Sequence, residues 1–151
     1  MATEYTHKRR VQFYETDAAG IVHFSWFFRY MEEAEHALWR AAGMSIDSPS
    51  LGPASSGAAS NPNKHLKWPR VAAAFDFKRP LRFEDEFEVH VGIAAVSTRT
   101  IQYNHTVKRG DITIGVGTVT AACVQIGADH ILKSVEIPPD ILTRLREQLV
   151  T

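Results

Sequence analysis

Apolar positions in the first third of the chain predict one long helix. They recur three or four residues apart, which is the spacing of a single helix face, at Phe24, Phe27, Phe28, Met31, Ala34, Leu38 and Ala42. Ser25 is the predicted N-cap of this helix, and Gly43 is its predicted end. The opposite side is mostly polar, but Trp26, Tyr30 and Ala37 interrupt it. We therefore expect the helix to be covered on more than one side, as it would be by a sheet wrapped around it.

The rest of the chain has the patterns of β-strands. A short β-favouring stretch, 7–14, precedes the helix and ends at an acidic turn. After the helix, alternating positions and a hairpin signal at Arg109-Gly110-Asp111 predict strands at 71–78, 87–96, 100–108 and 113–126. A short amphipathic helix is expected after Pro138-Pro139-Asp140, docked on the sheet edge or on a neighbouring subunit. The order strand, helix, antiparallel strands is typical of the α+β class.

One segment, 44–63, interrupts these patterns. It is crowded with Ser, Gly, Pro and Ala, a composition that buries too little apolar surface to offset its ordering entropy. We expect a mobile loop, either a lid over a site or a tolerated insertion. The chain has 151 residues, 44% of them apolar, which fits a single domain over 1–151.

Charge and cysteine content exclude several classes of partner and site. Lys plus Arg and Asp plus Glu number 17 each, so no long-range field attracts nucleic acid or an anionic membrane. A single cysteine, Cys123, excludes disulfides and cysteine-based zinc sites. No apolar run approaches the roughly 20 residues that cross a bilayer, and the first ten residues lack the apolar core of a signal peptide. We therefore expect a cytoplasmic protein with no nucleic-acid or membrane partner.

The segment before the long helix carries the clearest chemical signal. Asp17 lies in an Asp-Ala-Ala-Gly turn directly before the helix, so its carboxylate can act as base or nucleophile while free helix N–H groups stabilise an oxyanion. An Asx-turn or capping role is the alternative, and the pattern alone favours it. Gly20 is expected to have a positive φ or to let a substrate approach, although an ordinary turn glycine also fits. Glu15 is expected to be a solvated turn acid.

This turn, the long helix and the later Arg79-Pro80-Leu81-Arg82-Phe83-Glu84-Asp85 segment resemble the 4-hydroxybenzoyl-CoA thioesterase family of hotdog-fold acyl-CoA thioesterases. The resemblance covers most of the chain. It implies a hotdog fold, in which an antiparallel sheet of about five strands wraps a long central helix, here with a short C-terminal helix added. It also implies a homodimer or homotetramer with acyl-CoA sites at the subunit interface.

The resemblance further assigns the catalytic groups. Asp17 matches the family's essential aspartate, which attacks the thioester or activates water, and backbone N–H groups around His23 and Phe24 would form the oxyanion hole. A helper role for the His23 side chain and a partly buried ring bonded to backbone both remain open. No histidine has metal-ligand spacing, so we expect neither a metal nor a cofactor, coenzyme A being part of the substrate.

Residues that would bind the substrate are less specific. Lys64, Lys67, Arg70 and Arg99 are candidates for the phosphates of coenzyme A, although each is more often a solvated surface charge. Aromatic candidates for the acyl pocket are Tyr14, Trp26 and Trp68. Trp68, beside the Ser/Gly/Pro-rich segment, is the strongest of these, because aromatic residues in a helix are first of all core elements.

The sequence therefore favours an enzyme that hydrolyses an aromatic or short-chain acyl-CoA to a carboxylate and coenzyme A. Hydration of an acyl thioester is a second activity of the same fold, but it would need a histidine and an acid acting together. A third alternative is a non-catalytic acyl-CoA sensor or assembly module. The sequence does not identify the acyl group. It also does not show whether the acyl group is carried by coenzyme A or by acyl carrier protein.

Overall fold

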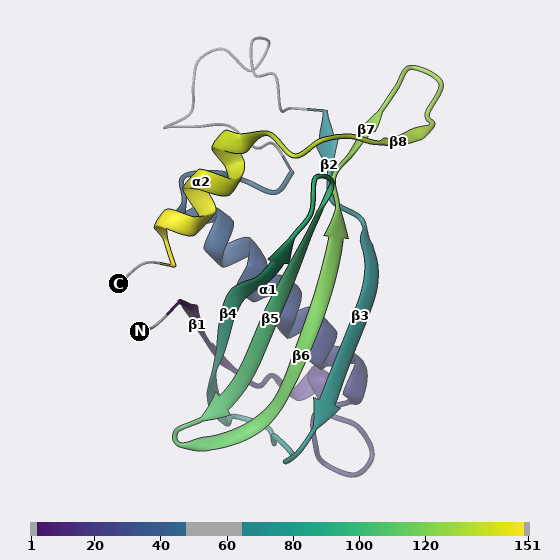
Figure 1. The fold of residues 1–151 in the computed structure, drawn as a ribbon. Coiled ribbons are helices and arrows are strands. Elements are labelled where there is room, and N and C mark those ends of the chain that lie inside the picture. The colour runs from purple at the N-terminus through teal and green to yellow at the C-terminus, as the bar shows by residue number, and fades with distance from the viewer. Residues whose placement is uncertain (1–2, 48–64, 150–151) are drawn as a thin grey trace.

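The computed structural model describes residues 3–47 and 65–149, in which an antiparallel sheet wraps one long helix (Figure 1). The sheet has five strands in the order β1-β4-β5-β6-β3, and the helix is α1 (Phe24–Ala41). The strands span Tyr5–Arg10 (β1), Arg70–Phe77 (β3), Glu86–Val96 (β4), Thr100–Arg109 (β5) and Ile112–Ala122 (β6). The predicted α+β class and hotdog architecture are confirmed.

Strand alternation explains how the sheet covers the helix. In β5, alternate side chains are buried while their neighbours are half-buried, because successive residues of a strand point to opposite faces. The buried set of β5 faces the core that Tyr30, Leu38 and Trp39 fill from α1, all with 0% exposure. Because these three residues point in different directions around α1, the helix is covered on more than one side, as predicted.

The two ends of α1 differ in how well the sequence predicts them. The N-cap is His23, not the predicted Ser25: the His23 Nδ1 atom accepts the Ser25 N–H at 3.2 Å. The capping acceptor is thus an imidazole nitrogen and not the expected serine hydroxyl. The end is as predicted, since Gly43 follows the helix with φ +80° and donates its N–H to the Arg40 carbonyl at 3.0 Å. Phe24, expected on the covered face, is 61% exposed because it lies in the first turn.

Two predicted strands are shorter than expected. The first ends at Arg10, and a 3-10 turn, η1 (Phe13–Glu15), follows because Gln12 and Glu15 cap each other. The last splits at Cys123, whose N–H donates to the Arg99 carbonyl at 2.8 Å. Beyond that point β7 (Val124–Ile126) forms a small three-stranded sheet with β2 (Leu66–Lys67) and β8 (Leu132–Ser134), two strands that the pattern did not predict.

The C-terminal helix α2 (Pro139–Glu147) begins with proline at its first position, as predicted. It buries Ile141 and Leu145 completely in the core of its own chain. Neither helix of the described residues has the length and apolar character needed to cross a membrane. The predicted mobile loop, 44–63, lies outside the described residues from position 48 onward.

Candidate active site

Both backbone and side-chain hydrogen bonds close the turn that contains Asp17. The Asp17 N–H donates to the Ile21 carbonyl at 2.8 Å, and the Gly20 N–H donates to the Asp17 carbonyl at 3.0 Å. Gly20 has φ +80°, the left-handed conformation expected of it. The Asp17 Oδ1 atom accepts the Ala19 N–H at 2.8 Å, so the predicted Asx-turn exists. This turn uses only the Oδ1 atom of the Asp17 carboxylate, and the Oδ2 atom has no hydrogen-bond partner within the described residues.

Glu15 anchors this turn, and the expectation that it is solvated is wrong. Its exposure is 0%, and its carboxylate accepts from four donors. Arg9 approaches from β1 with both terminal nitrogens, Tyr30 from α1 with its hydroxyl at 2.9 Å, and Gln12 with its N–H at 2.8 Å. These partners come from three elements that the sequence pattern does not place together, which is why the burial was missed.

The same contacts shift the ionisation of the partners. Burial, followed by the hydrogen bond to Glu15, raises the pKa of Tyr30 well above its ordinary range, so the phenol remains a donor. Burial alone would lower the pKa of Arg9, but Glu15 and Glu33 outweigh it and raise the pKa. Glu15 is therefore a fully hydrogen-bonded anchor at the base of the Asp17 turn.

At the start of α1, only one of the two predicted oxyanion donors is available. The His23 N–H donates to the Glu15 carbonyl at 2.8 Å, so it is already in use. The Phe24 N–H has no acceptor among the described residues, as is usual for the first turn of a helix. The His23 ring accepts the Ser25 N–H, so the predicted bond to the backbone is present, but the ring is exposed rather than partly buried. A helper role for the ring stays a prediction.

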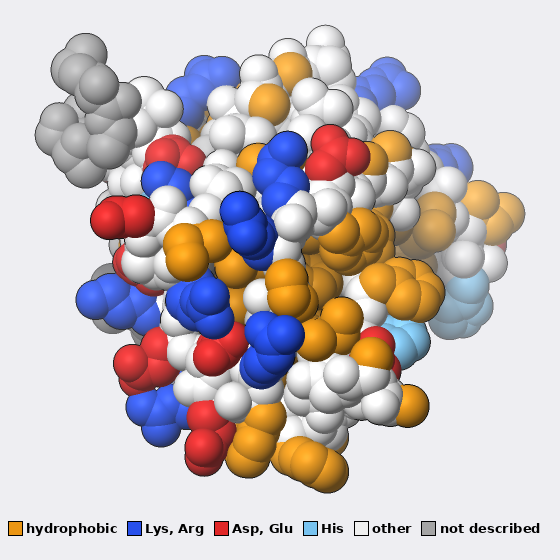
Figure 2. Space-filling view, turned by 90° about the horizontal axis from the view of Figure 1, so that it is seen from below, with side chains coloured by type: hydrophobic (Ala, Val, Ile, Leu, Met, Phe, Trp, Pro, Cys, Tyr) orange, Lys and Arg blue, Asp and Glu red, His pale blue; other side chains and the backbone are white. Residues whose placement is uncertain are grey.

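Asp17 and Phe24 line the same hollow, of about 450 Å³. Figure 2 looks toward this end of the molecule and shows hydrophobic side chains gathered beside Lys and Arg side chains. The apolar wall includes Phe27 and Phe77, whose rings lie 5.5 Å apart, and Lys78 and Arg79 supply positive charge. The rest of the lining is Ile21, Val22 and Pro80.

These two cations are functional candidates that the sequence reasoning missed. Lys78 and Arg79 directly follow β3 and donate their backbone N–H groups to the Ile114 carbonyl, at 2.9 and 3.0 Å. Their position after a strand was visible in the sequence. That the end of β3 meets the start of α1 is a tertiary fact that no local pattern contains.

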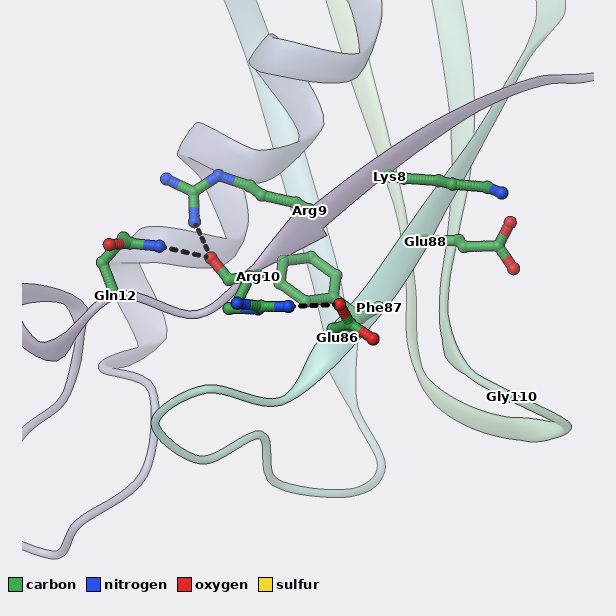
Figure 3. A pocket seen from close by; sticks show the side chains of 8 residues that line it. All are labelled: Lys8, Arg9, Arg10, Gln12, Glu86, Phe87, Glu88 and Gly110. Carbon is green, nitrogen blue, oxygen red and sulfur yellow. Dashed lines mark hydrogen bonds and ion pairs between the residues drawn. The ribbon is translucent and has the colours of Figure 1, made fainter.

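A larger hollow, of about 810 Å³, lies along β1 and β4 (Figure 3). Its charges are already matched: Arg10 pairs with Glu86, and Lys8 stands opposite Glu88 in the strand register. Arg9, which also lines it, is engaged by Glu15. This hollow offers no carboxylate beside a helix start, so the Asp17 hollow is the candidate active site.

The predicted phosphate-binding residues do not gather around Asp17. Arg70 begins β3 while Phe77 ends it beside Asp17, a separation of about 23 Å along the strand (Figure 1). Lys67 pairs with Asp47 at 3.2 Å, and Arg99 is exposed in the turn after β4. Lys64 lies outside the described residues.

Among the aromatic candidates, Tyr14 and Trp26 lie together near the helix start. Their rings meet edge to face at 5.5 Å, and Tyr14 is 67% exposed. Trp68 is 5% exposed and packs at 5.1 Å against Trp39, on the far part of α1. It does not line the Asp17 hollow but a second one, between α1 and β3. No cluster of three or more potential metal ligands occurs among the described residues.

Comparison with known proteins decides the family. The model of the thioesterase-like superfamily matches residues 11–145. The chain belongs to this superfamily. Its resemblance to the 4-hydroxybenzoyl-CoA thioesterase family is therefore confirmed, and the protein is a thioester hydrolase.

Three relatives illustrate the likeness. An esterase-like protein of Aquifex aeolicus (strain VF5) is 32% identical over 95% of this chain and 98% of its own. A crystal structure of a hypothetical protein from Aquifex aeolicus has a TM-score of 0.76 at 33% identity, covering 93% of this chain and 98% of that one. The 1,4-dihydroxy-2-naphthoyl-CoA hydrolase of Parasynechococcus marenigrum (strain WH8102) is 36% identical over 56% of this chain and 53% of its own.

Proposed function

We propose that this thioesterase hydrolyses an aromatic or short-chain acyl-CoA in the hollow beside the start of α1. One observation carries the proposal: the Asp17 carboxylate and the unbonded Phe24 N–H line the same hollow. A carboxylate and an oxyanion donor are the two groups that thioester hydrolysis requires.

In the proposed reaction the thioester carbonyl oxygen accepts the Phe24 N–H, and negative charge develops there as the carbonyl carbon becomes tetrahedral. Asp17 either takes a proton from the attacking water or attacks the carbon itself, forming an anhydride that water then opens. Coenzyme A leaves as the thiol. A thioester is already activated, so the proposed reaction uses no cofactor beyond the substrate.

Lys78 and Arg79 are the proposed partners of the coenzyme A phosphates, because they are the cations that line the hollow with Asp17. Phe24, Phe27 and Phe77 form a wall suited to an aromatic or short acyl group. The 1,4-dihydroxy-2-naphthoyl-CoA hydrolase among the relatives supports an aromatic group. We place the reaction in the cytoplasm, as the sequence predicts.

We further propose that the protein is a homodimer or homotetramer. β3 is an edge strand of the sheet, and most of its residues are exposed on both faces, including Val71 at 61% and Phe77 at 53%. Antiparallel pairing of two such edges would bring the Arg70 end of one copy toward the Phe77 end of the other. The predicted cation Arg70 would then approach the site of a second copy.

The first test is thiol release from a panel of aromatic, short-chain and long-chain acyl-CoAs. We expect Asp17→Asn and Asp17→Ala to abolish turnover. Asp17→Asn keeps an oxygen that can accept the Ala19 N–H, so its unfolding midpoint should stay nearly unchanged. Tight acyl-CoA binding without turnover by the native protein would contradict the proposal and favour a sensor.

The oxyanion donor needs a backbone test. Phe24→Pro deletes the N–H at the first helical position, where proline is tolerated, and the extended conformation of His23 (φ −62°, ψ 139°) suits a residue before proline. We expect kcat to fall by about 10²- to 10³-fold relative to the control Phe24→Ala, which keeps the N–H. Equal kcat values for the two variants would exclude this donor.

A further inference from the structure

Three cations lie close together on the segment between β3 and β4, next to the Asp17 hollow. The sequence from 77 to 83 is Phe-Lys-Arg-Pro-Leu-Arg-Phe. Lys78, Arg79 and Arg82 are exposed, and none of them has an ion-pair partner among the described residues. The chain as a whole has no net charge, so this segment is a local concentration of positive charge.

Two exposed aromatic rings adjoin these cations. Phe83 is 48% exposed, and Phe13 of η1, which is 73% exposed, packs against it edge to face at 5.6 Å. Figure 2 shows hydrophobic side chains gathered beside Lys and Arg side chains at this end of the molecule. Aromatic and arginine side chains that are exposed as a group are typical of an interaction surface. We call this surface, made of Phe13, Lys78, Arg79, Arg82 and Phe83, the rim.

The rim is attached to the active-site turn. Arg82 forms a β-bridge with Ile21, and the Val22 N–H donates to the Leu81 carbonyl at 2.8 Å. Leu81 is completely buried, so it fixes the segment to the core. Ile21 and Val22 line the Asp17 hollow, as do the first two cations of the rim. A partner bound to the rim would therefore lie beside the hollow in which hydrolysis is proposed.

Charge narrows the kind of partner. The rim has three cations and no acid, so an acidic surface would complement it. A second copy of this chain fits poorly, because a two-fold contact between rims would place cations against cations. An anionic bilayer also fits poorly, because it would extend over the exposed acids Glu84 and Glu86, which directly follow the rim. A small acidic protein can contact the cations without covering these acids.

We infer that the rim docks an acidic acyl carrier protein, which delivers its thioester to the Asp17 hollow. The inference rests on the proposed hydrolysis and adds the carrier of the acyl group. Water would cleave the same C–S bond as in an acyl-CoA, and the phosphopantetheine arm would stay on the carrier protein as a free thiol. The arm is common to both carriers, whereas Arg82 and the two aromatic rings would contact the carrier protein alone.

Docking is tested apart from hydrolysis, by calorimetric titration of the native protein with holo acyl carrier protein, which has no acyl group to lose. We expect saturable binding that weakens about tenfold or more in Arg82→Glu, because a repulsive charge replaces an attractive one. Arg146→Glu, exposed on α2, is the matched control and should bind as the native protein does. Absent binding, or equal weakening by both charge reversals, would overturn the inference.

The aromatic part of the rim has its own pair of variants. Phe83→Ser should weaken carrier binding about tenfold, because it removes apolar contact area. Leu132→Ser of β8, with a similar exposure of 54% for Leu132, should leave the binding unchanged. Binding to phosphatidylglycerol vesicles, or self-association, that depends on Arg82 while carrier binding does not would assign the rim to a membrane or to a second copy and overturn the inference.

Hydrolysis kinetics test delivery, with the same acyl group on the carrier protein and on coenzyme A. We expect Arg82→Glu to lower kcat/KM about tenfold for the carrier-bound thioester, less so at high salt, and to leave the acyl-CoA value unchanged. An equal loss on both substrates would contradict docking of a carrier protein. If neither thioester is hydrolysed while holo carrier protein still binds through Arg82, the proposed hydrolysis fails and the docking stands.

Discussion

Two buried glutamates, Glu15 before α1 and Glu35 within it, have different surroundings although each is paired with an arginine. Both have 0% exposure. Glu15 accepts from four donors and leaves neither oxygen unpaired. Around Glu35, by contrast, the Arg70 Nε atom and the His105 Nδ1 atom have no hydrogen-bond partner within the described residues, and Glu35 Oε2 lies 2.9 Å from His105 Nε2.

The two glutamates differ in how completely they are hydrogen-bonded and in which elements they join. A buried carboxylate with every donor in place fixes the elements that supply those donors, here β1, η1 and α1, and so holds the Asp17 turn. Glu15 therefore positions the active-site turn, whereas Glu35 joins α1 to β3 through Arg70 and to β5 through His105.

The largest expected effect is that of removing Glu15. In Glu15→Ala the half-buried Arg9 keeps only Glu33, and the Tyr30 hydroxyl and the Gln12 N–H lose their acceptor, so we expect the free energy of unfolding to fall by about 3–5 kcal/mol. Turnover should fall with it, because the Asp17 turn and the His23 N–H lose their anchor. Urea denaturation and thiol release check both, with the exposed Glu86→Ala as control. Unchanged stability would show that Glu15 does not hold β1, η1 and α1 together.

Removing Glu35 should cost less, because Glu35 accepts fewer hydrogen bonds than Glu15 and because Arg70, 22% exposed against 15% for Arg9, is more accessible to water. For Glu35→Met we expect a loss of about 2 kcal/mol, discounted from the value for a fully buried pair. The double variant Glu35→Met, Arg70→Met should recover to within about 1 kcal/mol of the native protein. The same urea measurement tests this, and a double variant less stable than Glu35→Met would mean that the cluster supports the fold as Glu15 does.

The sequence predicted the parts of this comparison that depend on local pattern. The Asp17 turn, the positive φ of Gly20, the long helix ending at Gly43 and the five-stranded wrapping all have signals within a few residues. Both glutamate clusters depend on contacts between elements far apart in the chain, such as Arg9 with Glu15 and Glu35 with His105. A glutamate in a turn or a helix has no local signal of burial, and the cations Lys78 and Arg79 were missed for the same reason.

A smaller effect is expected on kcat when one buried tyrosine hydroxyl is removed near Glu15 or far from it. Tyr30→Phe removes one of the four donors to Glu15, and we expect a loss of about 1–2 kcal/mol of stability together with a fall in kcat of about tenfold, because the Asp17 turn loosens. Tyr103→Phe removes a comparable buried hydroxyl, which accepts from Trp39 at 3.0 Å far from Asp17. It should lose similar stability with kcat unchanged. A fall in kcat in both variants would mean that α1 transmits any loosening to the active site.

The smallest effect is a difference in pH dependence. Burial lowers the pKa of His36, next to Glu35, below its ordinary 6.5, with the charge of Arg70 acting in the same direction. The unfolded chain then takes up a proton first, so stability is present above about pH 6.5 and is lost as the pH falls below it. Near Glu15, burial alone would raise the pKa of Glu33, but His7 and Arg9 outweigh it and hold the pKa below its ordinary 4.5.

Glu33 therefore adds stability that persists down to about pH 4.5 and is lost only at lower pH. Urea midpoints at pH 7, 5.5 and 4 distinguish the contributions of His36 and Glu33. His36→Gln should flatten the decline between pH 7 and 5.5, and Glu33→Gln should flatten only the decline toward pH 4. If His36→Gln leaves the upper decline unchanged, protonation of His36 does not contribute to it.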